Sequence, residues 1–152
     1  ADRAFLEVSE FGYNQDQGTV VAEYIPSLVD NDVRGVFELH STSGGSNRVY
    51  SSTGIIKHWF VKTGGAIVAD FDLGTPDVNQ LNKISGVYKK DDFAASLNGQ
   101  AVSTDTSGDV PVGITKFFIG QISYSFEING HIKSIQYYPL RLSNAQLQAL
   151  TV

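Results

Sequence analysis

The strongest constraint on the fold of this chain is a period-two alternation of apolar and polar residues in short runs. The apolar positions of three such runs are Val33, Phe37 and Leu39; Val20, Ala22 and Tyr24; and Phe93, Ala95 and Leu97. Polar residues, among them Glu38, His40 and Ser96, occupy positions between them. Because successive side chains of a strand point to opposite faces of a sheet, the pattern is typical of half-buried antiparallel strands.

Glycine and asparagine pairs separate these runs at positions that suit tight turns. Asn98-Gly99 joins the run ending at Leu97 to residues 100–104, and Gly64-Gly65 joins residues 55–62 to residues 66–71. Asn-Gly adopts the left-handed φ of a two-residue hairpin readily. Two more pairs, Gly44-Gly45 and Asn129-Gly130, separate further runs. About ten strands at a spacing of roughly 8–12 residues predict a β-sandwich or a barrel.

Only the C-terminus has a helical pattern. Ser143 and Gln146 have the spacing of a capping box, in which the two side chains bond to backbone amides at the start of a helix. Leu142 and Leu147 have the spacing of a hydrophobic staple, and Leu150 extends the same apolar face. We expect a short helix here, docked on an edge of the sandwich.

Composition excludes several classes of protein. The 152 residues suit one domain, 1–152, and the absence of Cys excludes disulfides and thiolate metal sites. The 11 basic and 16 acidic residues give a net charge of −5 without long runs of one sign, so we expect no nucleic-acid partner. No apolar run approaches the ~20 residues of a membrane span. The chain has no Met and no leader-like start, as expected of a processed chain or a piece of a longer one.

Two acidic patterns are candidates for chemistry. Asp70 and Asp72 lie two apart on one expected strand, so both would point to the same face, where they could share a proton or a metal, or pair with a neighbouring cation. The alternative is a solvated outer face beside an inward Phe71. The acidic loops 30–32 and 105–109 could supply oxygens to Ca²⁺, although the same residues are common in turns. No catalytic Ser motif or phosphate-binding loop is present, and the three His residues lie far apart.

The only Trp, Trp59, lies in a run where both faces are apolar. A Trp that faces outward would offer a stacking platform for a sugar ring, with Tyr50 and Arg48 of the preceding strand as neighbours. The alternative is a core Trp in a central strand. We therefore name Trp59, Tyr50, Arg48, Asp70 and Asp72 as candidate ligand-binding residues, with no catalytic residue among them.

The closing segment 130–143, with the sequence GHIKSIQYYPLRLS, resembles the last strand of laminin-G-like and concanavalin A-like jelly rolls, above all those of bacteriophage tail fibres and virion proteins. Residues 17–20, 88–99 and 118–120 resemble further strands of the same family. Within the closing segment, Ile132 and Ile135 lie three apart, which requires a β-bulge or two covered faces. Arg141 could cap carbonyls, pair with an acid, or lie free on the surface.

The resemblance implies an antiparallel β-sandwich of concanavalin A-like jelly-roll type that binds a glycan or a host cell-surface polysaccharide. It also implies a module of a larger virion or extracellular assembly, with other virion subunits as partners and homo-oligomers possible. The catalytic branch of this fold carries an E-x-D-x-x-E strand, whereas this chain has Asp70 and Asp72 with no Glu nearby. We therefore expect a binding module, no enzyme and no cofactor, with Ca²⁺ in the acidic loops as the open alternative. The alternatives are a structural domain of a virion without glycan binding and, last, a polysaccharide hydrolase or lyase that uses the two Asp residues.

Overall fold

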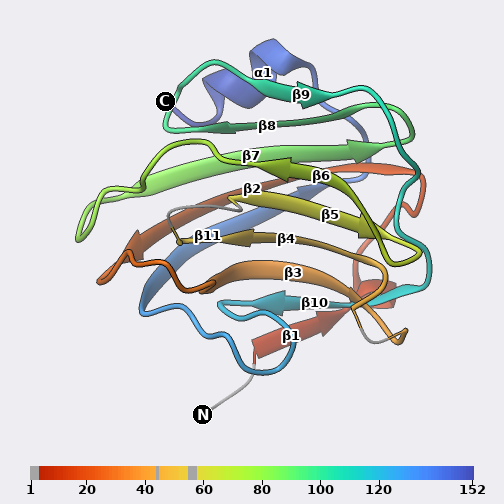
Figure 1. Ribbon diagram of the computed structural model, residues 1–152, viewed down its shortest axis with the longest axis horizontal. Helices are drawn as coiled ribbons and strands as arrows, with labels where there is room; N and C mark the ends of the chain where they lie inside the picture. The colour runs from red at the N-terminus through yellow and green to blue at the C-terminus, as the bar shows by residue number, and fades with distance from the viewer. Residues whose placement is uncertain (1–3, 44, 55–57) are drawn as a thin grey trace.

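Two antiparallel sheets face each other across the core (Figure 1). The computed structural model describes residues 4–43, 45–54 and 58–152. Within these residues one sheet has the order β1 (Ala4–Glu7), β10 (Ile114–Ile119), β3 (Gly35–Ser41), β4 (Arg48–Ser52), β5 (Trp59–Thr63) and β6 (Ala66–Phe71). The other has the order β11 (Gly130–Tyr138), β2 (Gln17–Pro26), β7 (Asn82–Lys89), β8 (Phe93–Leu97) and β9 (Ser103–Asp105). The predicted all-β antiparallel sandwich is confirmed.

The core lies between the sheets and is filled by the alternating residues. Val20, Ala22 and Tyr24 of β2 and Phe93, Ala95 and Leu97 of β8 meet Phe37 and Leu39 of β3 there. The placement of Val33 on the face of Phe37 is wrong, because Val33 packs with Tyr50 and Phe60 on the opposite face. A register shift between Gly35 and Phe37 accounts for the change of face, since one extra residue reverses the direction of the side chains.

Gly64-Gly65 forms the predicted two-residue hairpin, whereas Asn98-Gly99 forms a tight turn within a longer loop. Gly64 and Gly65, with φ of 57° and 88°, connect β5 to β6. Asn98 and Gly99 also have positive φ, 50° and 73°, and the Gln100 N–H donates to the Leu97 carbonyl at 3.0 Å. The strand after this turn, β9, begins three residues later than expected. The Gly44 half of one predicted turn, and residues 55–57 of one expected strand, lie outside the described residues.

The C-terminal helix α1 (Asn144–Ala149) begins at the predicted capping box. The Gln146 N–H donates to Oγ of Ser143 at 3.2 Å, and the Ser143 N–H donates to Oε1 of Gln146 at 2.9 Å. A single-turn 3₁₀ helix, η1 (Val8–Glu10), follows β1. Among the described residues, no helix has the length and apolar character needed to cross a membrane.

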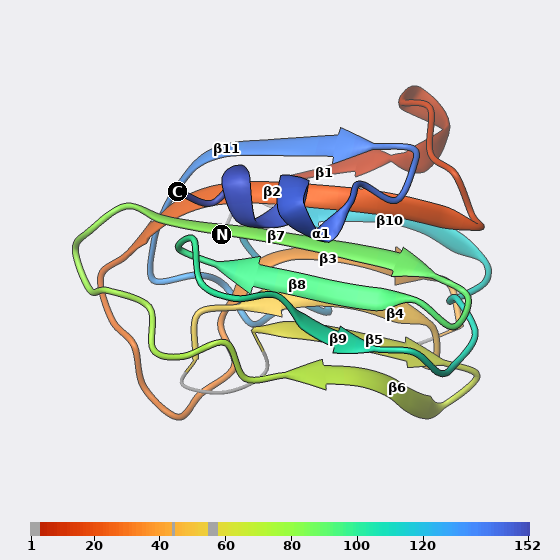
Figure 2. The same ribbon diagram turned by 90° about the horizontal axis from the view of Figure 1, so that it is seen from above.

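Helix α1 covers the outer face of β7 and β8 (Figure 2). This position differs from the edge of the sandwich that the sequence predicts. Leu142 and Leu147 form a small second core with Val87 and Ala94 of these strands. The Ser85 hydroxyl donates to the Leu147 carbonyl at 2.8 Å. Strands β7 and β8 are therefore buried on both faces, which explains their nearly continuous burial.

Two features of the closing segment have the predicted form. A register shift between Ile132 and Ser134 is the β-bulge that the spacing of the two Ile residues required, and both Ile132 and Ile135 pack against the main core. Arg141 pairs with an acid: Nε and Nη2 donate to the two carboxylate oxygens of Asp92 at 2.9 and 2.8 Å. This bidentate pair fixes the chain just before α1.

Candidate functional site

The outer face of the six-stranded sheet carries a row of polar and aromatic side chains. Glu38 and His40 on β3 pair across the ladder with Tyr50 and Arg48 on β4. Tyr50 in turn pairs with Phe60 on β5, and their rings stack with centroids 4.7 Å apart. Because the core-facing residues of these strands alternate with this row, the same period that builds the core presents these groups outward.

The segment 120–128, which follows β10, folds back over this face. Ser123 and Tyr124 have left-handed φ values of 52° and 65°, and the N–H groups of Ser125 and Phe126 donate to the Ile122 carbonyl at 3.1 Å. The Gly35 N–H donates to the Phe126 carbonyl at 2.8 Å. The backbone approaches Gly35 so closely that a Cβ there would lie 2.4 Å from the carbonyl carbon of Gln121. Gly35 therefore allows this segment to lie on the sheet.

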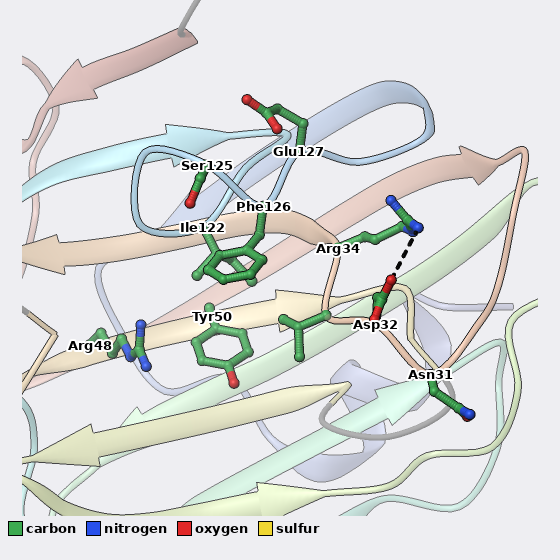
Figure 3. A pocket seen from close by; sticks show the side chains of 10 residues that line it. Asn31, Asp32, Arg34, Arg48, Tyr50, Ile122, Ser125, Phe126 and Glu127 are labelled. Atoms are coloured by element: carbon green, nitrogen blue, oxygen red, sulfur yellow. Dashed lines mark ion pairs between the residues drawn. The ribbon is translucent and has the colours of Figure 1, made fainter.

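A cleft of about 680 Å³ opens between this segment and the loop that precedes β3 (Figure 3). Arg48 and Tyr50 come from strand β4, while Arg34 and Phe126 come from the two loops that flank the opening (Figure 3). Among the described residues, the lining consists of Asn31, Asp32, Val33, Arg34, Arg48, Tyr50, Ile122, Ser125, Phe126 and Glu127.

The charges of the cleft are arranged in two groups. On one side Nη2 of Arg34 lies 2.8 Å from Asp30 and 3.5 Å from Asp32, and the hydrogen bond from Arg34 lowers the pKa of Asp30. On the other side Nη1 of Arg48 donates to Oγ of Ser123 at 2.9 Å and lies 3.6 Å from Oε1 of Glu38. Arg34 and Arg48 are thus both oriented by fixed partners.

The Arg48 guanidinium also lies over the ring of Tyr50, with its central carbon 5.2 Å from the ring centroid. Burial raises the pKa of Tyr50 to about 12, and the positive charge of Arg48 opposes this shift. The Tyr50 hydroxyl is therefore protonated at neutral pH and able to donate a hydrogen bond. Phe126 is 53% exposed, so its ring is available to a ligand.

This arrangement suits a ligand with many hydroxyl groups. Residues with guanidinium, carboxylate, amide and hydroxyl groups line one concave space, and an exposed aromatic ring offers an apolar platform. Binding sites for small polar ligands combine a few oriented polar groups with an aromatic or apolar wall. The cleft has this combination.

The structure brings together two of the five predicted site residues, Arg48 and Tyr50. Trp59 lies apart from them in the core, fully buried, with its ring 5.8 Å from that of Phe37. It cannot stack on a sugar, and the alternative of a core Trp in a central strand is what the structure has. The reason is that Phe60, the next residue, takes the outward position in the pair with Tyr50.

Asp70 and Asp72 do not line the cleft. Asp70 pairs with Phe60 at the exposed face of β6. Asp72 lies just beyond the strand and is exposed, and its Oδ1 accepts the Gly74 N–H at 3.0 Å. In residues 4–43, 45–54 and 58–152, no three His, Asp or Glu side chains form a group that could hold a metal ion. The calcium hypothesis therefore gains no ligand cluster from the acidic loops.

Sequence reasoning missed the loop residues of the cleft. Asn31 and Asp32 were candidates only as Ca²⁺ ligands or turn residues, Arg34 was placed on the polar face of a strand, and residues 122–127 follow a strand without any motif. One signal in the sequence was Phe126, a large aromatic residue between the polar residues Ser125 and Glu127. The stretch that contains it is bounded by Gly120 and Gly130, as is typical of a loop. Large aromatic side chains in polar loops often serve binding.

No protein-family profile and no curated protein sequence matches the chain. Solved structures do match. The sialidase carbohydrate-binding module CBM40 of Ruminococcus gnavus, bound to α2,3-sialyllactose, has a TM-score of 0.73 at 17% identity, over 91% of this chain and 84% of that one. The chain shares this β-sandwich fold. At such identity the likeness concerns the fold alone.

Two other matches have the same character. Domain 4 of AbnA, an extracellular arabinanase of Geobacillus stearothermophilus, in complex with arabinotriose, has a TM-score of 0.64 at 13% identity, over 93% of this chain and 69% of that one. The NanB sialidase of Streptococcus pneumoniae has a TM-score of 0.71 at 15% identity, over 95% of this chain and 26% of that one. This chain thus corresponds to about a quarter of the length of NanB.

Proposed function

We propose that this protein is a non-catalytic glycan-binding module that holds a saccharide in the cleft between residues 30–34 and 122–127. The observation that carries the proposal is the convergence of Arg48, Tyr50 and Phe126 on one concave space. Two matching structures are described as complexes with saccharides, sialyllactose and arabinotriose, which supports the assignment of a glycan as the ligand.

The guanidinium of Arg48 favours a glycan that carries a carboxylate. Arginine binds carboxylates with strong, charge-assisted hydrogen bonds. Arg34 is already held by two Asp side chains, whereas in the described residues the acidic neighbour of Arg48 is Glu38, at 3.6 Å. We therefore assign Arg48 as the residue that contacts an acidic sugar and Phe126 as the residue that contacts its apolar face.

The test is a calorimetric titration with three probes: α2,3-sialyllactose, lactose and arabinotriose. We expect sialyllactose to bind more tightly than lactose, because only sialyllactose carries a carboxylate. Arg48→Gln should remove the preference, while Lys133→Gln, which changes an exposed cation on the other sheet, should not. Failure of all three probes to bind at millimolar concentration would contradict the proposal, and equal binding of sialyllactose and lactose would contradict the role of Arg48.

We further propose that the module works in an extracellular assembly, such as a phage particle, and recognises a host cell-surface polysaccharide. A single small cleft gives weak affinity, which several copies on one particle would raise by multivalency. Fusion of the chain to a trimerising segment should increase its retention on a polysaccharide-coated surface far more than its affinity for a free oligosaccharide. Equal gains in both assays would argue against this context.

A second candidate function, a structural domain of a virion, is favoured by one other observation. Edge strand β1 exposes Phe5 and Leu6, which are 42% and 43% exposed, beside an apolar groove of about 340 Å³. Exposed apolar edges are sites where chains associate. Light scattering after size-exclusion chromatography distinguishes the two functions, because a stable oligomer supports the assembly role and a monomer supports an independent binding module.

A further inference from the structure

Glu38 lies beneath the cleft and does not line it. Its side chain is fully buried on the outer face of β3, under the segment 120–128. Burying a carboxylate is costly unless charged or hydrogen-bonding groups surround it. The partners of Glu38 therefore indicate what its burial accomplishes.

Those partners belong to the cleft. Oε2 of Glu38 accepts the backbone N–H of Ser123 at 2.6 Å. Oε1 lies 3.6 Å from Nη1 of Arg48 and 3.3 Å from Nδ1 of His40, without a well-aligned hydrogen bond in the described part of the chain. Arg48 in turn donates to Oγ of Ser123 at 2.9 Å. Glu38, Arg48 and Ser123 thus form a closed triangle between the floor of the cleft and its wall.

The wall needs such an anchor. Ser123 and Tyr124 are two consecutive non-glycine residues with left-handed φ, a conformation that persists only when surrounding contacts hold it. The contact from Glu38 to the Ser123 N–H reaches the first of these residues directly. Phe126, the exposed aromatic of the cleft, lies three residues further along the same turn.

We propose that Glu38 is the positioning residue of the cleft: its carboxylate fixes the Arg48 guanidinium and the Ser123 turn in the arrangement that receives a saccharide. This inference rests on the proposed function. Glu38 itself does not contact the ligand. A neutral side chain of the same shape would keep the packing but lose the attraction to Arg48.

The test compares Glu38→Gln with Glu23→Gln, a matched change at an acid that pairs with Lys83 and Lys133 on the other sheet. With α2,3-sialyllactose as probe, Glu38→Gln should weaken binding about tenfold, and Glu23→Gln should leave it unchanged. In an Arg48→Gln background, which has no cation at position 48, the same Glu38→Gln change should weaken binding less than about twofold, because the two residues act together. An equal loss in both backgrounds would show a merely structural role and overturn the inference.

A second readout needs no ligand. Because the neutral amide oxygen of Gln accepts the Ser123 N–H less strongly than the Glu38 carboxylate does, Glu38→Gln should speed hydrogen exchange of the Ser123 amide about tenfold and leave the Leu147 amide in α1 unchanged. Unchanged exchange at Ser123 would overturn the inference whether or not a glycan binds. Faster exchange together with failure of the wild-type chain to bind any probe would contradict the proposed function and leave the anchoring of the turn established.

If Glu38→Gln fails to fold, Ser123→Ala tests the same triangle through the contact between Arg48 and Ser123. It removes the hydroxyl that accepts from Arg48 and keeps the backbone N–H. It should weaken sialyllactose binding severalfold in the wild-type background and have almost no effect in the Arg48→Gln background. Wild-type affinity in Ser123→Ala would contradict the triangle.

Discussion

Gly86 on β7 lies against the indole ring of Trp59 on β5, so closely that a Cβ on Gly86 would come within 2.3 Å of Cε3 of Trp59. The two residues belong to different sheets, so this contact is a point where the sheets meet directly. The large ring fills the core because the position opposite it has no side chain. The same contact removes Trp59 from any role at the surface.

Gly86→Ala should therefore destabilise the protein by about 3 kcal/mol, because a rigid ring and two strands must move apart. The matched control is Gly12→Ala, where an added Cβ meets nothing within 4 Å. Chemical denaturation of both variants checks the prediction. Equal stabilities would show that the core can adjust at Gly86.

The stability of the protein should fall below about pH 6.5, because the unfolded state then binds a proton at His58 that the folded state resists. Burial lowers the pKa of this fully buried His, whose Nδ1 accepts the Leu73 N–H at 2.9 Å. Nε2 then carries the proton and donates to the Gly54 carbonyl at 2.8 Å. The loss should level off below the folded-state pKa. Urea denaturation between pH 5 and 8 measures it, and His58→Gln should flatten the profile in that range.

Tyr88→Phe should cost about 1–2 kcal/mol, because it breaks a buried hydrogen-bond network. The Tyr88 hydroxyl donates to the Asn14 carbonyl at 2.6 Å and lies 2.8 Å from the Tyr137 hydroxyl. Burial raises the pKa of Tyr88 far above its ordinary value, so no phenolate should appear there before alkaline unfolding. Tyr138→Phe is the control, because the Tyr138 hydroxyl donates to the exposed Gln136 side chain at 3.2 Å. A loss of the same size in both variants would contradict the role of the network.

Asp92→Asn should cost about 1 kcal/mol, because it weakens the bidentate pair with Arg141 that precedes α1. Asp109→Asn makes the same chemical change in a solvent-exposed pair with Lys90, 3.7 Å apart, and should have no measurable effect. Thermal denaturation of both variants, measured in parallel, compares their stabilities. The prediction fails if Asp92→Asn is as stable as Asp109→Asn.

Phe126→Ala should weaken glycan binding about three- to tenfold and leave the melting temperature unchanged, because the ring is exposed in the cleft. Phe5→Ala removes an exposed ring outside the cleft and should leave binding unchanged. Titration with α2,3-sialyllactose provides the measurement. Loss of binding in both variants would show that Phe126 is not a specific contact.

The hairpins and the helix start could be predicted because each depends on residues close together in the sequence. Gly64 and Gly65 adopt positive φ without steric cost because they have no Cβ. Ser143 and Gln146 each accept a hydrogen bond from the other's backbone N–H within one helical turn. The alternation likewise placed Arg48 and Tyr50 on one face of β4. These properties depend on local sterics and hydrogen bonding, which neighbouring residues fix.

The cleft depends on contacts between distant residues, which the sequence did not reveal. Trp59 and Phe60 are both large aromatics, so alternation could not choose between them, and the space above Gly86 decided that Trp59 faces inward. The sequence by itself thus determined most of the strands, the Gly64-Gly65 hairpin and the cap of α1. Only the tertiary structure decided which face became the site, because sheet order places β10 beside β3 and lets residues 122–127 cover an acid, Glu38, more than 80 positions earlier in the chain.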